Sequence, residues 1–380
     1  MTRTQKSILS ILSLIACVLV AFVGYDGFQA YQTYATRPLG PSIPQFTPLA
    51  LPATWTPTPG DPLTSLGAVT YAPTLVVPAT NTSAPICGGS GVMTVLAVGA
   101  DSRSDTYQYG LADVIRVVRV DFSNRKVTAL EFPRDLWVQI PYISDNINGQ
   151  DHEKLNQAYL YGQPGDGFGY WDDPSRGPGL LALTLNLNFG VVVDHYLAVN
   201  MRTFVNVVNA VDGIDLNIPN EKYAENTGLD MGKHHLNGDE ALKVTRNREQ
   251  GVFARVDNQN LVLCALRKKL TSPTVVTKIP DLITSFQDNV FTDLSPQQIS
   301  QFACLGPQLP PGNISFVRFP EELFKQARTY DPVFKKRVFT WDVDFNILRD
   351  YVARFQAGTW PAATVAATPA PDEQTEMICE

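Results

Sequence analysis

Two aspartates are spaced so that they could act together on a phosphate-containing ligand. Asp101 follows an apolar strand-like run in the turn Gly99-Ala100-Asp101-Ser102-Arg103, and Asp113 stands just before the next such run. Because ligands in open α/β sheets bind at strand ends, neighbouring strands would bring both carboxylates to one edge. One or two carboxylates, completed by substrate phosphate and water, suit Mg²⁺. The simpler alternative is that a lone aspartate closes its own turn through the backbone, but the pair beside several arginines favours a metal site.

Several side chains that donate to phosphate oxygens accompany these aspartates. A guanidinium can hold a phosphate through two parallel hydrogen bonds, which a lysine cannot. Arg246 and Arg248 alternate and would project to one side of an extended segment, whereas Arg255 and Gln259 are one helical turn apart. Each arginine alone is more often a solvated side chain or part of a structural ion pair. Together they indicate an anion site, whose candidate donors are Arg103, Arg134, Lys154, Arg246, Arg248, Arg255 and Gln259.

Composition argues against several other functions. The 380-residue chain has a net charge of -7, whereas nucleic-acid binding needs a clustered basic surface. The sequence lacks the Gly-x-Ser-x-Gly motif of serine hydrolases, and its four histidines show no metal or triad pattern. The arginines are therefore a local concentration in an acidic protein, which is typical of a site for a small anionic ligand.

An apolar run from Ser7 to Val23 follows Arg3 and Lys6. Its length is at the short end for a membrane-spanning helix, and the positive flank would stay cytoplasmic. A cleaved signal peptide and a lipoprotein signal ending at Cys17 are alternatives. Against them, the run lacks a small-x-small cleavage site after it and continues past Cys17. We favour a retained single-pass anchor in the cell membrane; all three interpretations place the bulk of the chain outside the cytoplasm.

Composition also divides the chain into five predicted segments. These are a cytoplasmic N-terminus (1–6), the transmembrane anchor (7–23), a Pro/Thr-rich stalk (24–90), a catalytic domain (91–355) and a tail (356–380). Recurring prolines make the stalk a semi-rigid spacer. The tail is expected to be disordered unless Cys379 ties it down.

Four of the five cysteines lie in the part predicted to be exported. Cys87, Cys264, Cys304 and Cys379 allow three pairings in an oxidising setting, and the sequence does not choose between them. Cys264 lies in an apolar helical stretch, where a buried free thiol is the simplest interpretation.

Strand-like and helix-like segments alternate along the folded part, which predicts an α/β domain with a mixed central β-sheet flanked by helices. Short β-branched apolar runs predict the strands, and apolar residues at helical spacing predict the helices. The runs 114–122 and 126–132 should form a hairpin. The other expected strands are 92–98, 136–140, 191–199 and 214–218, and the expected helices are 153–161, 179–188, 203–211, 240–244, 254–270 and 297–303.

Seven motifs occur in an order that resembles the LytR–CpsA–Psr family. The resemblance is strong over about 92–270 and weaker to about 353, and it implies an apolar pocket for a polyprenyl chain in a single exported domain. The motifs are Leu96-Ala97-Val98-Gly99-Ala100-Asp101-Ser102-Arg103, Glu131-Phe132-Pro133-Arg134-Asp135, Lys154-Leu155-Asn156-Gln157-Ala158-Tyr159, Asp194-His195-Tyr196, Val211-Asp212-Gly213-Ile214-Asp215, Leu236-Asn237-Gly238-Asp239-Glu240-Ala241-Leu242 and Arg246-Asn247-Arg248.

The resemblance also implies an activity and roles for residues. Family members look like phosphotransferases that move a glycopolymer from undecaprenyl (polyprenyl) diphosphate to a muramic-acid hydroxyl of peptidoglycan during cell-wall assembly. By position, Asp101 and Asp113 would hold Mg²⁺ and, with Arg134, carry the chemistry. The diphosphate would be bound by Arg134, Arg246, Arg248, Arg255 and Gln259, with Lys154 nearby.

Three positions depart from the family pattern. Leu111 and Asn258 stand where arginines are usual, and Val252 stands where an acid is usual. These losses weaken the charge clamp, so the alternative is a non-catalytic protein that binds polyprenyl diphosphate or wall polymer. Arg116, on the next strand, is a candidate to replace the charge missing at Leu111. A transcriptional role would need a cytoplasmic domain, against which Arg3 and Lys6 argue.

Overall fold

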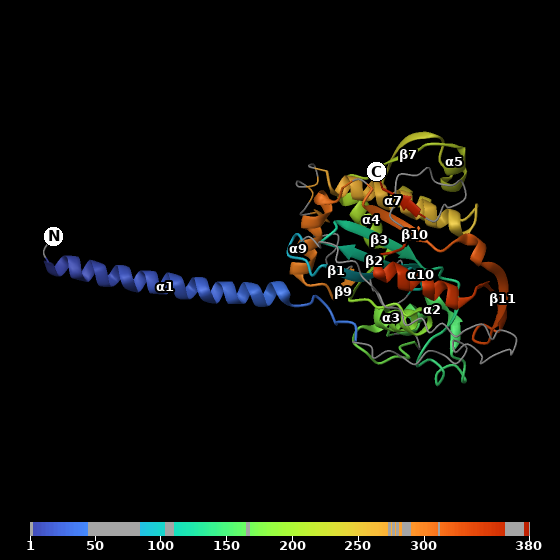
Figure 1. Cartoon of the computed structure of the whole chain (residues 1–380), viewed down its shortest axis with the longest axis horizontal. Helices are drawn as coiled ribbons and strands as arrows, with labels where there is room; N and C mark the ends of the chain where they lie inside the picture. Colours follow the sequence, from blue (N-terminus) through green and yellow to red (C-terminus); the bar gives the residue numbers. More distant parts are fainter. Residues whose placement is uncertain are drawn as a thin grey trace, which may run out of the picture.

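The computed structural model of the protein describes most of the chain. The described residues are 3–44, 84–102, 110–164, 168–272, 275, 278, 281–282, 290–310, 312–361 and 376–379, with only the backbone described for 3–19 and 376–378. A long helix, α1 (Arg3–Thr36), projects from one end of a folded domain (Figure 1).

A mixed sheet of seven strands forms the centre of this domain, in the order β13-β10-β3-β2-β1-β6-β9. β1 pairs antiparallel with β2 and parallel with β6, and β3 pairs antiparallel with β2 and parallel with β10. The α/β class and the β2–β3 hairpin predicted from the sequence are thus confirmed. The strands are β1 (Val92–Ala100), β2 (Ala112–Asp121), β3 (Lys126–Glu131), β6 (His195–Asn200), β9 (Val290–Thr292), β10 (Ile314–Arg318) and β13 (Glu376–Ile378).

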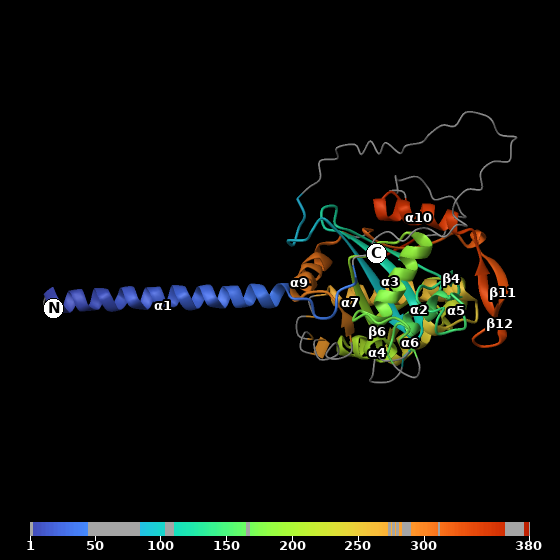
Figure 2. The same ribbon diagram turned by 90° about the horizontal axis from the view of Figure 1, so that it is seen from below.

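Helices cover both faces of the sheet. Successive residues of a strand point to opposite faces, so Leu96 and Val98 of β1 pack in the main core while Ala97 and Gly99 face the other side. The core side carries α2 (Leu155–Tyr161), α3 (Arg176–Phe189) and α10 (Phe345–Ala357), and α3 lies in front of the strands in Figure 2. The other side carries α4 (Met201–Ala210), α6 (Gly238–Arg246) and α7 (Val252–Leu270).

Three short two-stranded sheets and several short helices complete the described part of the domain. They are β4 (Trp137–Gln139) with β5 (His152–Lys154), β7 (Ile214–Ile218) with β8 (Gly232–Leu236), β11 (Lys325–Asp331) with β12 (Lys336–Asp342), α5 (Glu221–Thr227), α9 (Pro296–Leu305), η3 (Gly306–Gln308) and η4 (Glu321–Leu323).

Some predicted boundaries were wrong, because pairing between distant residues overrides local preference. The helix expected from Glu153 starts only at Leu155, since residues 152–154 pair with β4 as a strand. The strand expected over 136–140 is the three-residue β4, and the strand expected from Val191 begins at His195, where pairing with β1 starts.

The first part of the segment predicted as an extended stalk is helical or lies against the domain. Residues 24–36 continue α1, and the chain then lies along the domain: Leu39 N donates to Leu294 O (3.2 Å), Tyr196 Oη donates to Pro41 O (2.9 Å), and Ile43 is buried. Residues 45–83 of the predicted stalk lie outside the described residues. Among the helices that are described, none combines the length and hydropathy required of a membrane span.

Two disulfides fix the cysteine pairing that the sequence left open. Cys87 bonds Cys304, and Cys264 bonds Cys379. Cys264 is therefore not the free thiol expected from its apolar surroundings. The second disulfide holds the end of the chain, where β13 adds to the edge of the sheet beside β10. The tail was expected to be disordered unless Cys379 tied it down, and this disulfide does hold residues 376–379. Residues 356–361 are also ordered at the end of α10, while 362–375 lie outside the described residues.

Candidate active site

Asp101 is held at the end of β1 by the start of β2. Its backbone N–H donates to Leu111 O (3.0 Å), and its Oδ1 accepts a hydrogen bond from Leu111 N (2.7 Å). The turn-closing role considered from the sequence is therefore real, but it occupies only one carboxylate oxygen. At Leu111, where an arginine was expected by resemblance, the backbone rather than the side chain makes the contact.

Asp113 is the point at which the predicted residues meet. Its Oδ1 pairs with Arg134 Nη1, and its Oδ2 lies 3.4 Å from Arg248 Nη2. Arg134 follows β3 and Arg248 follows α6, so three separate elements converge at the beginning of β2. Arg248 keeps 48% of its side chain exposed, which leaves it able to turn to a ligand.

A second carboxylate, Asp135, orients the neighbouring cations. Its Oδ2 accepts from Arg134 Nε at 3.3 Å, and its Oδ1 accepts from Lys154 Nζ at 2.8 Å. The sequence suggested Asp135 only as a partner for a structural ion pair. Its bridging role depends on β5 pairing with β4, which brings Lys154 beside the Pro133-Arg134-Asp135 turn, and the spacing of these residues gives no signal for that.

Arg255 and Gln259 project from one face of α7, as their spacing predicts. Arg255 is 4% exposed and Gln259 is 6% exposed. Gln259 Nε2 donates to Thr245 O (3.3 Å), which ties α7 to α6. From the strand below, Arg116 Nη2 lies 3.5 Å from Gln259 Oε1.

Arg116 forms a buried ion pair that the sequence analysis missed. Its Nε is 2.5 Å from Glu131 Oε2, and the two residues are register partners on β2 and β3. The Arg116 guanidinium also stacks over Phe316, 5.1 Å from the ring centroid. An acid inside the apolar run 126–132, opposite a basic residue on the facing strand, was the signal that could have found this pair. Arg116 therefore contacts Gln259, and it does not replace the charge missing at Leu111.

A pocket of about 280 Å³ joins these polar groups to an apolar wall. Asp113, Arg116, Arg246, Arg255 and Gln259 lie along its lining. The remainder is mostly apolar and comes chiefly from the side of the sheet opposite the main core, with α4, α6 and α7 above it. The apolar members on that side include Ala97, Leu197, Val199, Met201, Phe204, Leu242 and Leu263. Because Arg255, Gln259 and Leu263 follow one another at four-residue intervals, the lining changes from charged to apolar over about 12 Å of helix.

Electrostatics in the site reflect carboxylates and guanidiniums crowded together. Burial raises the pKa of Asp101, and the negative charge of Asp113 raises it further, against the lowering effect of the Leu111 hydrogen bond and of Arg134. Burial lowers the pKa of Arg255, and the positive charge of Arg134 adds to this. Asp113 and Asp135 together raise the pKa of Arg134 in spite of its burial. An anion between these guanidiniums would relieve their mutual repulsion.

The donor set fits Mg²⁺ as a shared site rather than a closed cage. Among the residues that the structure describes, no three His, Cys, Asp or Glu side chains gather as a metal cluster. Asp101 and Asp113 are close enough for one to raise the pKa of the other. Mg²⁺ commonly uses one or two carboxylates and takes its other ligands from phosphate and water. These two residues would hold it, once a diphosphate had drawn Arg134 and Arg248 away from Asp113.

The structure thus brings together most of the residues predicted from the sequence. Asp101, Asp113, Arg134, Lys154 and Arg248 are linked by direct contacts or charge, and Arg246, Arg255 and Gln259 share the pocket with Asp113. Arg103 lies outside the described residues. Of the three departures, Asn258 is buried and donates from Nδ2 to Asn226 O (2.7 Å), so it joins α7 to α5, while Val252 packs against the core.

This fold and this site define an α/β domain with a cluster of arginines at the edge of a mostly apolar pocket. The chain belongs to the LytR-CpsA-Psr family, whose LytR_cpsA_psr family model matches residues 78–339.

Individual relatives are distant. Over 210 residues the chain is 29% identical to the polyisoprenyl-teichoic acid–peptidoglycan teichoic acid transferase TagU of Bacillus mycoides (strain KBAB4), covering 54% of this chain and 62% of the relative. It is 29% identical over 217 residues to the regulatory protein MsrR of Staphylococcus aureus (strain COL), covering 56% and 59%. The alignments therefore span less than two thirds of either relative. The structure of TagT bound to LI-WTA superposes with a TM-score of 0.51 at 20% identity, covering 71% of this chain and 91% of TagT, and supports the fold.

Proposed function

We propose that this protein transfers a glycopolymer from a polyprenyl diphosphate carrier to peptidoglycan. The observation that carries the proposal is the pocket in which Asp113, Arg246, Arg255 and Gln259 adjoin a mostly apolar wall. A polyprenyl diphosphate combines a doubly charged headgroup with a hydrocarbon chain, and this pocket offers a surface for each. TagU is named as a transferase of polyisoprenyl-linked teichoic acid to peptidoglycan, and TagT was solved bound to LI-WTA, which supports the same substrate class.

The residues of the site have distinct tasks in this reaction. Arg134, Arg248 and Arg255 hold the diphosphate oxygens and neutralise the charge that grows on the leaving phosphate. An acceptor hydroxyl attacks the phosphorus bonded to the glycan, the bond from that phosphorus to the bridging oxygen breaks, and polyprenyl monophosphate leaves. Bound between Asp101 and Asp113, Mg²⁺ would add Lewis-acid stabilisation of the same charge. The acceptor proton would pass to a carboxylate of the site that is not occupied by the metal; Asp101 is the candidate, because burial and the charge of Asp113 raise its pKa in the metal-free protein.

We also propose that the segment Ser7 to Val23 holds the protein at the outer face of the cell membrane. The support is the apolar sequence behind Arg3 and Lys6. The helix α1 that contains it continues to Thr36, and the residues after it lie against the domain. A lipid-linked donor would then be reached without a long spacer between bilayer and domain.

The Asp101→Asn variant tests the transferase. Asparagine can still accept the Leu111 hydrogen bond through its oxygen, so the turn should persist, but it cannot take a proton or bind Mg²⁺ well. We expect release of polyprenyl phosphate from a lipid-diphosphate glycan, measured with peptidoglycan and Mg²⁺, to fall about 10²- to 10³-fold. Asp145→Asn, at an exposed loop position, is the matched control and should keep full activity. Full activity of Asp101→Asn would remove the proposal.

A non-catalytic lipid-diphosphate binder is the second candidate. It is favoured by one observation: both oxygens of Asp113 are engaged by arginines, and neither Val252 nor Asn258 supplies the charge expected from the family pattern. A binder would co-purify with lipid and show no Mg²⁺-dependent release of polyprenyl phosphate, from either the native protein or the variant.

A further inference from the structure

A second and larger hollow lies on the far side of α7 from the arginine pocket. It measures about 960 Å³ and is formed by α5, the first turns of α7, η4 and the β11–β12 hairpin; we call it the hairpin groove. Phe253, Ala254 and Asp257 of α7 line this groove, whereas Arg255, Gln259 and Leu263 line the arginine pocket. Residues at four-residue spacing share a helix face, so α7 is a wall with one cavity on each side.

The two cavities approach each other at the beginning of α7. Gln250 and Gly251 line the hairpin groove, two and three residues after Arg248, whose guanidinium faces Asp113. A ligand that occupies the groove and extends past Gly251 would therefore arrive beside the residues proposed to hold the diphosphate.

The charge of the groove differs in sign from that of the pocket. Four acids (Glu225, Asp257, Glu321 and Glu322) stand against two bases (Lys222 and Arg318) along its lining. The positive charge of Arg318 is largely neutralised by two of these acids. Its Nη1 lies 2.5 Å from Glu321 Oε1, and its Nη2 lies 3.9 Å from Asp257 Oδ2. Such a surface repels an anionic glycopolymer and attracts an amine.

The groove also presents aromatic surface. Phe253, Phe339 and Trp341 line it; Phe253 and Trp341 have ring centroids 5.6 Å apart, and Phe339 meets Trp341 edge to face at 4.9 Å. Phe253 and Phe339 are only partly buried. Aromatic faces next to carboxylates can pack against the apolar faces of sugar rings and accept hydrogen bonds from their hydroxyl groups.

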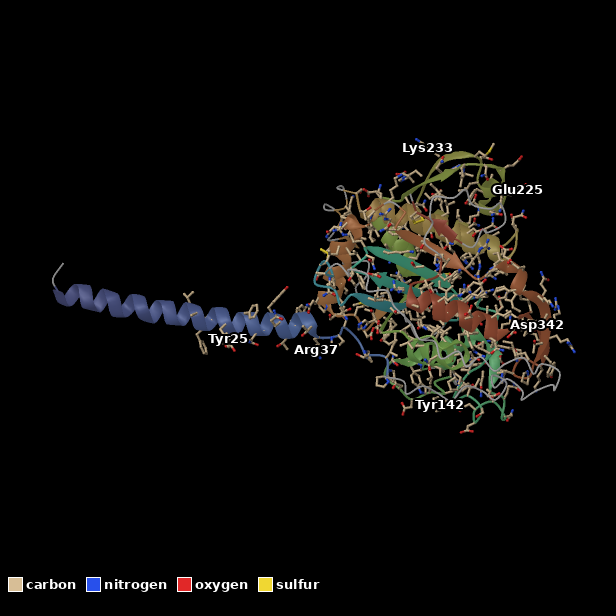
Figure 3. The ribbon with its side chains drawn as sticks, in the orientation of Figure 1. Tyr25, Arg37, Tyr142, Glu225, Lys233 and Asp342 are labelled. Atoms are coloured by element: carbon tan, nitrogen blue, oxygen red, sulfur yellow. A yellow bond between two sulfur atoms is a disulfide. The ribbon has the colours of Figure 1, made fainter. Side chains whose placement is uncertain are left out.

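The β11–β12 hairpin, which forms one wall of the groove, lies at the end of the domain opposite α1 (Figures 1 and 2). Both views show the β11–β12 hairpin at that end, and Figure 3 places Glu225 there. If α1 carries the anchor, this end points away from the bilayer.

From these observations we propose that the hairpin groove binds the acceptor, a sugar–peptide chain of peptidoglycan that carries free amino groups. That the bound chain is the acceptor rests on the proposed function. That the groove binds a sugar–peptide chain rests on the charges and aromatic residues of the groove alone. The donor polymer is kept on the arginine side by charge, and the acceptor hydroxyl enters over Gly251.

The experiment is a calorimetric titration of the full chain with a soluble disaccharide–peptide fragment of peptidoglycan. The test variant is Glu225→Lys with Glu322→Lys, two exposed positions on the groove rim. We expect its affinity for the fragment to be about tenfold weaker than wild type, because two attractive charges become repulsive. Acetylating the amino group of the fragment should weaken its binding to the wild type and have little effect on the variant.

The matched control is Asp230→Lys with Asp342→Lys, which changes net charge equally at exposed positions that do not line the groove. It should bind the fragment as the wild type does, and both double variants should bind polyprenyl diphosphate normally. Glu225→Gln with Glu322→Gln gives a milder second test if the lysine variant folds poorly. Equal fragment affinity in the wild type and both groove variants, or no fragment binding by the wild type, overturns the proposal. Fragment binding in the groove without any donor turnover would instead sink the proposed function and leave the groove as a binding site.

Discussion

Asp113 is the single residue through which the candidate site is connected. It receives Arg134 and Arg248, and its charge acts on Asp101. Carboxylates so placed hold arginines in position before a substrate arrives, which reduces the ordering cost of binding an anion.

The Asp113→Asn variant should lower the pKa of Asp101. Burial is the largest cause of the raised value and remains, but the repulsion by Asp113 disappears while Arg134 still attracts the charged form. In the metal-free protein we therefore expect the carboxyl titration of Asp101, followed by NMR, to move to lower pH. Asp135→Asn is the control, since Asp135 is not among the charges that act on Asp101. A shift to higher pH would contradict this account.

Removing one partner of the Arg116–Glu131 ion pair should destabilise the fold strongly, whereas replacing both residues with apolar ones should destabilise it little. Arg116→Met leaves a carboxylate that is 5% exposed without its nearest cation, and we expect a loss of about 3–5 kcal/mol in the free energy of unfolding. Met at both positions should recover most of that loss, as measured by urea denaturation. Equal stability of the single and double variants would show that the pair is not coupled.

Individual site residues were predictable to different degrees. Asp101, Asp113 and the arginines could be found because strand ends and helical spacing bring them together. Glu131 was missed and Asp135 was considered only as an ion-pair partner, because their contacts with Arg116 and Lys154 come from pairing between strands.

Among the elements, the start of α7 positions most of the pocket. Gly251 caps this helix with φ +98° and ψ -174°, a conformation that essentially only glycine adopts. Arg255, one turn later, depends on that geometry, since its N–H donates to Gly251 O (3.4 Å).

Replacing Gly251 with alanine should therefore strain the backbone. A Cβ there would meet no atom within 4 Å, so the cost is conformational rather than steric. We expect a loss of about 1–3 kcal/mol in unfolding free energy, together with weaker binding of polyprenyl diphosphate. Gly190→Ala, in the left-handed helical region at φ +71°, is the control and should cost less without affecting the ligand. Unchanged stability of the Gly251 variant would show that α7 can start in another way.

Elements with a strong local pattern were predicted well, and those defined by distant partners were not. β1, β2 and β3 could be predicted as strands from their own β-branched apolar residues. β5 does not, because His152–Lys154 is a strand only by virtue of β4.

At the scale of the whole molecule, disulfides join parts of the chain that are far apart in the sequence. Cys264–Cys379 spans 115 residues and fastens the last strand to α7. The pairing could not be predicted from the sequence, because four cysteines at these spacings are equivalent until the fold places Cys87 beside α9 and Cys379 beside α7.

Removing this disulfide with Cys264→Ala and Cys379→Ala should cost about 2–5 kcal/mol of unfolding free energy, because a long loop is released in the unfolded chain. The arginine pocket is formed by other residues, so transfer activity at low temperature should persist. Thermal unfolding followed beside activity separates the two effects. Loss of activity without loss of stability would mean that the last strand serves the site directly.

The position of α7 between two cavities has a thermodynamic consequence. If a molecule on one side alters the affinity of the other side, the reverse effect must have equal size, since coupling free energies are reciprocal. Through this shared helix, binding of the peptidoglycan chain would raise the affinity for the lipid carrier. Hydrolysis of the carrier would then be rarer whenever no acceptor is bound.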